Sequence, residues 1–283
     1  MTASLMLAVY AIVNGNEQGW TSIKTLGLLG GAAALLALFL SIEGRIADPL
    51  MPLGLFRNRN ISTANVVGAL MAAGLFAYFF FSALYLQLVL EYSPLEVGLA
   101  YLPGTVIWGA SSLLLSDKLV MRLGIKTPLL IGLALMMLAL VLLARTPVDG
   151  SWAIDILPAT IAVGLGAGIA FNPILLAAMS DVGEEQAGLA SGVVNTAFMM
   201  GGAVGLAVLA SLADSRSESL LASGEGTLAA LNSGYHVAFV VGAVFVAAAA
   251  ALGARLLRAA SAPAPEALEA HGRPAAAETG SGC

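Results

Sequence analysis

The stretch from Thr160 to Ala213 decides how this chain is organised. It reads TIAVGLGAGIAFNPILLAAM (160–179), SDVGEEQAG (180–188) and LASGVVNTAFMMGGAVGLAVLASLA (189–213). Two long apolar segments rich in glycine flank a short acidic connection, and each has the roughly 20 residues that an α-helix needs to cross a bilayer. The stretch therefore predicts two membrane-spanning helices joined by a short loop.

The second apolar segment carries a face of unusual composition. Four-three-four-three spacing places five residues on one side of a helix, namely Gly188, Gly192, Asn195, Met199 and Gly202. Small residues allow helices to approach closely, and a buried Asn amide needs a partner. We expect this face to lie against protein or a water-filled cavity, with the three glycines serving helix packing.

The composition predicts an all-α polytopic membrane protein. Of 283 residues, 59% are hydrophobic and only 10% are charged, and the mean hydropathy is +0.92. A soluble domain needs far more charge to cover its surface. The single cysteine, Cys283, and two distant histidines form no recognisable metal or catalytic cluster. We therefore expect no metal site, no cofactor, no nucleic-acid partner and no enzymatic activity.

Apolar segments recur along nearly the whole chain. We count eight, at residues 3–14, 22–43, 61–90, 96–116, 127–145, 152–179, 186–213 and 235–257. A dozen helical residues span only about 18 Å of a hydrocarbon core roughly 30 Å thick, so the first segment is too short to cross. We expect a truncated first helix, in a chain that begins within a helix of a longer protein.

The basic residues predict the orientation in the membrane. If the first segment starts on the cytoplasmic side, nine of the twelve Lys and Arg residues are cytoplasmic, all except Lys24, Arg145 and Arg216. Cytoplasmic loops carry an excess of basic residues. This arrangement predicts a cytoplasmic C-terminus.

The loops divide the chain into four parts. Residues 1–43 contain two helices, the first truncated, and residues 44–60 form a cytoplasmic loop with three arginines and two prolines. Residues 61–258 supply a six-helix bundle. The tail at 259–283 is rich in Ala, Pro, Glu and Gly, a composition typical of disorder.

Three connections within the bundle carry local signals. Ser93 and Glu96 have the spacing of a capping box that opens a helix. Residues 116–126 (SDKLVMRLGIK) predict a basic cytoplasmic turn, and residues 214–234 predict a long polar loop on the external side.

Aromatic and hydroxyl side chains mark one helical face. Tyr78, Ser82 and Tyr85 follow one another at helical spacing, and Trp108 is expected near mid-membrane on the next helix. Such side chains could line a cavity for lipophilic cations or planar compounds. Helix packing, together with an interfacial position for Tyr85, is the alternative, and the sequence leaves both open.

The segment at 152–179 combines glycines with a proline. Gly164 and Gly168 predict close helix packing. Pro173 removes one helical hydrogen bond and predicts a kink, either a flexing point with Asn172 beside a substrate or a packed kink. Asp155 is the only acidic candidate in a predicted span, and its place near the helix start favours an interfacial carboxylate over a proton carrier.

Four stretches resemble the drug:proton antiporter branch of the major facilitator superfamily whose members have fourteen helices. They are GW (19–20), DPLMPLGLFRNRN (48–60), YLQLVLEYSPLEVGLAYLP (85–103) and GLASGVVNTAFMMGGAVGLA (188–207). The resemblance implies that the eight segments correspond to the last eight of fourteen helices, with the first two linking two six-helix bundles. It also implies that an N-terminal six-helix half is missing.

The resemblance further implies a function for the complete protein: proton-driven efflux of small lipophilic compounds across a plasma membrane. Asp117, Arg122 and Lys126 resemble the family's cytoplasmic gating motif, for which a plain basic turn is the alternative. Asn195 and Met199 would face the substrate cavity. A non-transporting membrane scaffold or partner-binding fragment is the alternative function.

Overall fold

The computed structural model describes residues 2–15, 19, 22–46, 53–180 and 183–257, and every regular element in these ranges is a helix. The all-α prediction is therefore confirmed. The α-helices are α1 (Thr2–Val13), α3 (Ile23–Glu43), α4 (Arg59–Leu84), α5 (Pro94–Ser111), α6 (Asp117–Leu123), α7 (Lys126–Leu143), α8 (Leu157–Met179), α9 (Glu184–Ala222) and α10 (Thr227–Leu256). A 3₁₀ turn (η1, Leu53–Arg57) precedes α4, and π-helical turns lie at Tyr85–Val89 (η2), Ser112–Ser116 (η3) and Trp152–Ile156 (η4).

Seven helical stretches in the described residues are long and apolar enough to cross a membrane. They are Ile23–Glu43, Arg59–Val89, Pro94–Leu123, Lys126–Leu143, Trp152–Met179, Gln186–Ala222 and Thr227–Leu256. The first helix, Thr2–Val13, is apolar but shorter. The chain is thus a multi-pass membrane protein, and its predicted short first segment is present as a short helix.

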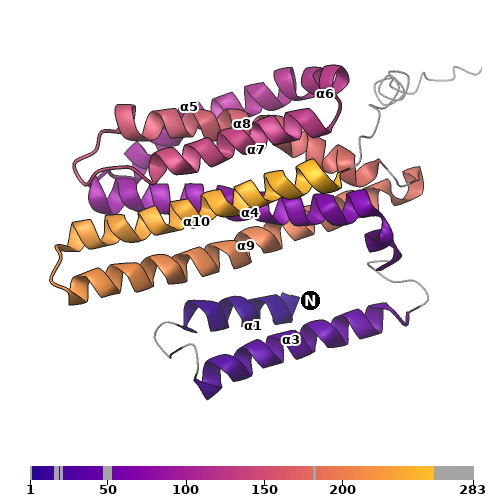
Figure 1. Cartoon of the computed structure of the whole chain (residues 1–283), viewed down its shortest axis with the longest axis horizontal. Coiled ribbons are helices and arrows are strands. Elements are labelled where there is room, and N and C mark those ends of the chain that lie inside the picture. The colour runs from indigo at the N-terminus through magenta and orange to yellow at the C-terminus, as the bar shows by residue number, and fades with distance from the viewer. Residues whose placement is uncertain (1, 16–18, 20–21, 47–52, 181–182, 258–283) are drawn as a thin grey trace, which may run out of the picture.

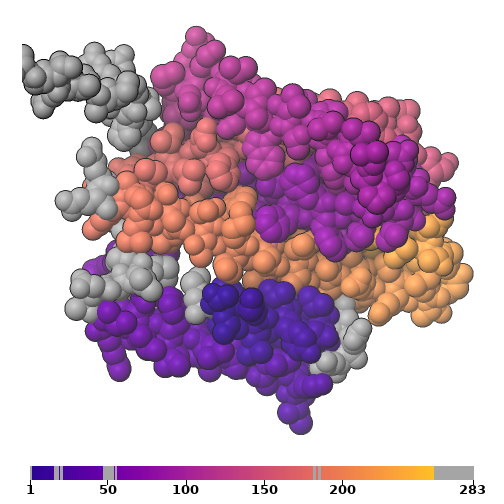
Figure 2. Space-filling view, turned by 180° about the vertical axis from the view of Figure 1, so that it is seen from behind, coloured from indigo at the N-terminus to yellow at the C-terminus, as the bar shows by residue number. Residues whose placement is uncertain are grey.

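The helices run side by side along the long axis of the molecule (Figure 1). Helix α4 packs against both α9 and α10, α8 joins α5 to α7, and α7 also contacts α10. Helices α1 and α3 contact each other, and α1 contacts α9. Figure 2 shows these two N-terminal helices as a layer along one side of the orange α9. Six long helices therefore form one bundle, and the first two lie beside it.

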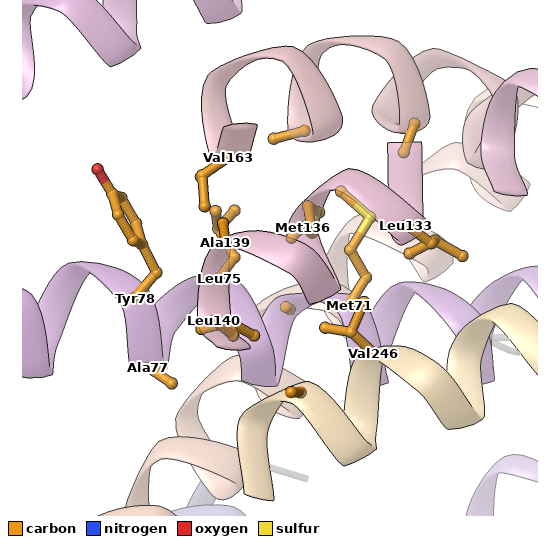
Figure 3. Close-up of a cluster of buried hydrophobic side chains, with 14 of the residues drawn as sticks. Met71, Leu75, Ala77, Tyr78, Leu133, Met136, Ala139, Leu140, Val163 and Val246 are labelled. Atoms are coloured by element: carbon orange, nitrogen blue, oxygen red, sulfur yellow. The ribbon is translucent and has the colours of Figure 1, made fainter. Parts of the chain in front are cut away.

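The hydrophobic core of the bundle lies where α4, α7, α8 and α10 meet (Figure 3). Met71 of α4, Leu133 and Met136 of α7, and Val246 of α10 are at most 1% exposed. Tyr78 lies at the edge of this cluster, with its hydroxyl pointing away from it (Figure 3). The core thus fills one side of α4 and leaves the other side for a set of aromatic residues.

Glycines bring the backbones of neighbouring helices together. A Cβ atom added to Gly166 of α8 would lie 2.6 Å from the carbonyl oxygen of Gly132 in α7, and one on Gly164 would lie 2.5 Å from that of Gly104 in α5. Gly168 faces Ser111 of α5. Gly164 and Gly168 therefore pack against α5 and Gly166 packs against α7, which is how α8 packs tightly between these two helices.

Two predicted connections are wrong, because the helices continue through them. Residues 117–123 form α6, which extends the helix of α5, and only Gly124 and Ile125 separate it from α7. Gly124 has a φ of 73°, a conformation that favours glycine and ends α6. At the other end, α9 runs to Ala222 and α10 begins at Thr227, so the predicted 21-residue loop shrinks to residues 223–226. The polar residues expected in these two loops belong to helices.

The remaining loops follow the sequence more closely. The capping box before α5 is confirmed, since Ser93 Oγ accepts from the amide of Glu96 and the Glu96 carboxylate accepts from the amide of Ser93. Helix α8 continues across Pro173. Residues 47–52 of the predicted cytoplasmic loop and the whole predicted tail at 259–283 lie outside the described residues.

The glycine contacts predict a position-dependent cost of adding one methyl group. Gly166→Ala should destabilise the protein by about 1–3 kcal/mol, because the added methyl overpacks the contact between α7 and α8. Gly109→Ala in α5 is the matched control, since a Cβ atom there meets open space. Equilibrium unfolding of the purified protein in detergent measures both. Equal stabilities of the two variants would contradict this packing.

Candidate functional site

A cluster of aromatic and hydroxyl side chains lies where α4, α5 and α8 meet. The Tyr78 hydroxyl donates to Thr160 Oγ1 of α8 at 3.1 Å, and Ser82 Oγ lies 2.7 Å from the Tyr101 hydroxyl of α5. The Tyr101 hydroxyl also contacts the carbonyl of Phe79, and Ser82 Oγ that of Tyr78. The Ser82 and Tyr101 hydroxyls have two protons for these three contacts, so at most two can be hydrogen bonds at one time.

The cluster encloses little space. Its cavity has a volume of about 10 Å³, room for no more than one water molecule. The lining residues are Tyr78, Phe79, Tyr101, Gly104, Thr105, Trp108, Thr160, Val163 and Gly164. Tyr78 and Trp108 therefore line the same small cavity between helices, and their predicted role in a substrate cavity stays a prediction.

A larger groove lies between α4 and α9, next to the cluster. Its volume is about 460 Å³, within the range of small-molecule sites. It is lined by Phe76, Phe79, Phe80, Ala83, Leu84 and Leu206. Phe79 lines both spaces, so its side chain is a wall common to the groove and the aromatic cluster.

The small face of α9 leads to this groove. Gly202 packs against the ring of Phe76, and Leu206, four residues further along the same face, lines the groove. In the other direction the face is open: Asn195 and Gly192 are exposed, and Met199 is 48% exposed. The face predicted from the sequence is thus part packed and part free.

The predicted packing role of the glycines on this face holds for one of the three. Added Cβ atoms at Gly188 and Gly192 would meet open space, so neither glycine packs against another helix within the described chain. The close contacts to α4 come instead from Gly201 and Gly205, which lie against Ala69 and Ala73. The face of α9 that packs against α4 is therefore turned about the helix axis from the predicted face, by about the angle between successive residues.

Two groups of aromatic rings pack between the helices and meet on α4. Phe171 of α8 packs edge-on against Phe198 of α9 with centroids 5.6 Å apart, and Phe198 packs against Phe76 of α4 at 6.4 Å. On the same helix as Phe76, Phe79 stacks on Trp108 of α5 at 6.4 Å. Of these rings, those of Phe76 and Phe79 line the groove, and their π surface suits planar or cationic apolar compounds.

Tyr85 lies apart from this site. It is 1% exposed, and its hydroxyl donates to the carbonyl oxygen of Pro147 at 2.7 Å. From α10, the side chains of Asn232 and His236 each place a nitrogen 2.8 Å from the carbonyl oxygen of Thr146. In this conformation Tyr85 therefore holds the loop between α7 and η4, and its predicted cavity role stays a prediction.

The other predicted residues lie near the ends of helices or beside the aromatic rings. Asn172 is half-buried in α8 next to Phe171, and Pro173 is buried. Asp117 and Arg122 are exposed on α6, and Lys126 begins α7. Five residues along a helix correspond to about 140° of rotation, so the Asp117 and Arg122 side chains diverge. The gate stays a prediction.

Acidic and metal-binding groups are sparse. No group of three or more His, Cys, Asp or Glu residues that could hold a metal ion occurs in the described residues. The Asp155 carboxylate accepts from the amide of Ser151 at 2.7 Å, at the start of η4. Asp155 therefore caps a helix end, in agreement with the interfacial interpretation.

Sequence reasoning missed several residues of the site. Phe79, Tyr101 and Thr160 complete the cluster, while Phe76 and Phe80 line the groove. The sequence carries a signal for one residue of the groove lining: Leu206 follows Gly202 by four residues and so continues the helical spacing of the α9 face. The pairing of Tyr101 with Ser82 could not be predicted from the sequence, because it depends on how α5 packs against α4.

Comparison with known proteins places the chain in a family. Residues 44–206 match the model of the Major Facilitator Superfamily. Over 252 residues the chain is 33% identical to the puromycin resistance protein pur8 of Streptomyces alboniger, a match that covers 86% of this chain and 50% of the relative. It is 34% identical to the multidrug resistance protein Stp of Mycobacterium tuberculosis over 72% of this chain and 37% of the relative. It is 32% identical to the cephamycin export protein CmcT of Amycolatopsis lactamdurans over 89% and 50%.

The chain belongs to the major facilitator superfamily, a class of membrane transporters. These three relatives are drug and antibiotic resistance or export proteins, which confirms the resemblance to the drug-exporting branch drawn from the sequence. The chain spans half or less of the length of each of them.

The hydroxyl cluster predicts a measurable coupling between α4 and α5. In a double-mutant cycle, Ser82→Ala and Tyr101→Phe should show a coupling free energy of about 0.5–1.5 kcal/mol, because each removes the partner of the other hydroxyl. Ser82→Ala combined with Tyr235→Phe is the control, since Tyr235 packs against Phe81 rather than Ser82. Unfolding in detergent measures all variants. Coupling no larger than that of the control pair would show that the hydroxyl contact does not form.

Proposed function

We propose that this chain forms the C-terminal half of an efflux transporter, which exports small lipophilic compounds by alternating access. The α4–α9 groove carries the proposal, because it combines a ligand-sized space with aromatic walls and borders the open face of α9. The export and resistance functions of the relatives agree with it. The chain is expected to have no enzymatic activity and to need no cofactor.

The exposed part of the α9 face supports the proposal that a second helical bundle packs against this half. Asn195 and Met199 lie exposed beside a packed bundle, and an exposed Asn amide in a membrane span is costly unless it meets protein or water. An N-terminal six-helix bundle would cover this face and close the groove into a cavity. Transporters of this kind move one bundle against the other around a central site.

The energy source and the orientation belong to the same proposal. We propose a proton gradient across the plasma membrane as the driving force, with the C-terminus in the cytoplasm as the distribution of basic residues predicts. The lining of the groove contains no carboxylate, so the residue that binds the proton is expected in the N-terminal half. Asp117, Arg122 and Lys126 would act in gating on the cytoplasmic side.

The groove also limits the kind of substrate. Its lining side chains are all apolar or aromatic, so it selects planar, lipophilic compounds by shape and π contact. Nearby hydroxyls of Tyr78, Ser82 and Tyr101 could donate to a substrate only after leaving their present partners.

Ethidium accumulation in a drug-sensitive bacterium tests the function. The chain joined to the N-terminal half of the puromycin resistance relative should lower the steady-state ethidium level, and a protonophore should abolish the difference. The chain alone should leave it unchanged, because alternating access needs both bundles. Proton-dependent efflux by the chain alone would contradict the half-transporter proposal, and a joined protein that inserts but never exports would favour the scaffold alternative.

Thiol labelling tests the assignment of the α9 face. The one native cysteine, Cys283, is first replaced by serine. In the joined protein, Asn195→Cys and Met199→Cys should react with a membrane-impermeant maleimide, and ethidium should slow the reaction, because both side chains line the cavity. Val240→Cys in α10 is the control, since this exposed position borders α7 and lies outside the lining of the α4–α9 groove. Labelling at position 195 that matches position 240 would place Asn195 toward lipid.

A further inference from the structure

A second groove lies between α7 and α10, which run antiparallel and side by side (Figure 1). Its volume is about 410 Å³. It is lined by Met137, Val141, Ala144, Arg145, Val240, Ala243, Val244 and Ala247. It shares no residue with the α4–α9 groove, so the proposed function does not account for it.

The groove exists because small side chains lie between larger ones. Ala243 and Ala247 of α10 and Ala144 at the end of α7 form its floor, while Val240, Val244 and Met137 stand beside it, 51%, 58% and 37% exposed. In a membrane protein these exposed apolar side chains face hydrocarbon. The groove is therefore open to the lipid phase along its length.

One end of the groove is charged. Arg145 follows the last residues of α7 and is the only ionisable residue in the lining. It is exposed, and the described part of the chain provides no carboxylate within ion-pair distance of its guanidinium. From Arg145 to Met137 the groove runs about 12 Å along α7, at 1.5 Å per residue. An apolar slot thus leads from a cation at the membrane surface into the hydrocarbon core.

We propose that this groove binds an anionic phospholipid, with its phosphate on Arg145 and one acyl chain in the slot between α7 and α10. A guanidinium binds phosphate by two parallel hydrogen bonds, and the arginine stem can lie along the apolar wall. An acyl chain fills a narrow slot of this length and matches its apolar lining. The ligand class follows from a phosphate-binding cation at the mouth and a hydrocarbon-lined slot behind it.

A lipid fits this groove better than a partner helix does. A helix that spans the membrane is about 30 Å long, whereas the groove extends for little more than two helical turns. The cation at its mouth also calls for a negative charge, which a phospholipid brings together with its chain. The site would therefore act on stability and is independent of whether the protein transports.

Thermal unfolding of the full chain in detergent tests the proposal, with dioleoyl phosphatidylglycerol compared with dioleoyl phosphatidylcholine. The anionic lipid should raise the Tm more than the zwitterionic lipid, and native mass spectrometry should detect its bound form. Arg145→Gln should abolish the difference, whereas Arg145→Lys should retain part of it, since Lys keeps the charge but loses the two-pronged contact. Arg216→Gln, which removes an exposed arginine outside the groove, is the control and should leave the difference intact.

Further measurements test whether the slot is needed and whether a lipid, rather than phosphate alone, is the ligand. Ala247→Leu should fill the groove and remove the anionic-lipid effect while Arg145 remains, whereas Ala110→Leu on the exposed surface of α5 should not. Inorganic phosphate at the same concentration should not raise the Tm. Equal effects of the two lipids, an unchanged preference in Arg145→Gln, or an equal effect of inorganic phosphate would each overturn the proposal. Because no arm measures efflux, these outcomes are separate from failure of the proposed function.

Discussion

The close approach of glycine backbones holds the bundle together. In a bilayer the hydrophobic effect does not drive helices against one another, because lipid tails are as apolar as leucine. Van der Waals contact at short range has to replace it. The pairs Gly132–Gly166 and Gly104–Gly164 provide that contact, since each leaves no room for even a methyl group. With α8 clamped between α5 and α7, the remaining helices have a fixed surface to pack on.

This arrangement gives α4 two different sides. Toward α7 and α10 it contributes Met71 and Leu75 to a core that is almost completely buried. Toward α9 and α5 it presents Phe76, Phe79 and Phe80, which border a groove. A helix with one buried and one cavity-facing side can keep the bundle intact while it supplies a binding surface. The two grooves differ in chemistry: the α4–α9 groove is lined by aromatic and aliphatic side chains, whereas the α7–α10 groove is aliphatic and ends in a cation.

The sequence predicted most of the helices but misplaced several of their ends. Residues 117–123 and 214–222 were expected in loops because they are polar, yet both are helical. A polar helix end beyond the hydrocarbon core has no apolar periodicity, so hydropathy finds where the membrane ends rather than where the helix ends. Among the site residues, Tyr78 and Trp108 line the same small cavity, whereas the Tyr85 hydroxyl bonds to the loop at Pro147.

By itself, the sequence determined the class of protein, the number of long apolar helices and the family, because these depend on composition, segment length and linear motifs. It also indicated that the face of α9 from Gly188 to Gly202 is not an ordinary lipid-facing surface. Only the tertiary structure decided which part of that face is packed, since the rotation of α9 against α4 puts Gly201 and Gly205, rather than Gly188 and Gly192, in contact. Helical spacing defines which residues share a face, but the neighbour that each face meets depends on the packing of all the helices.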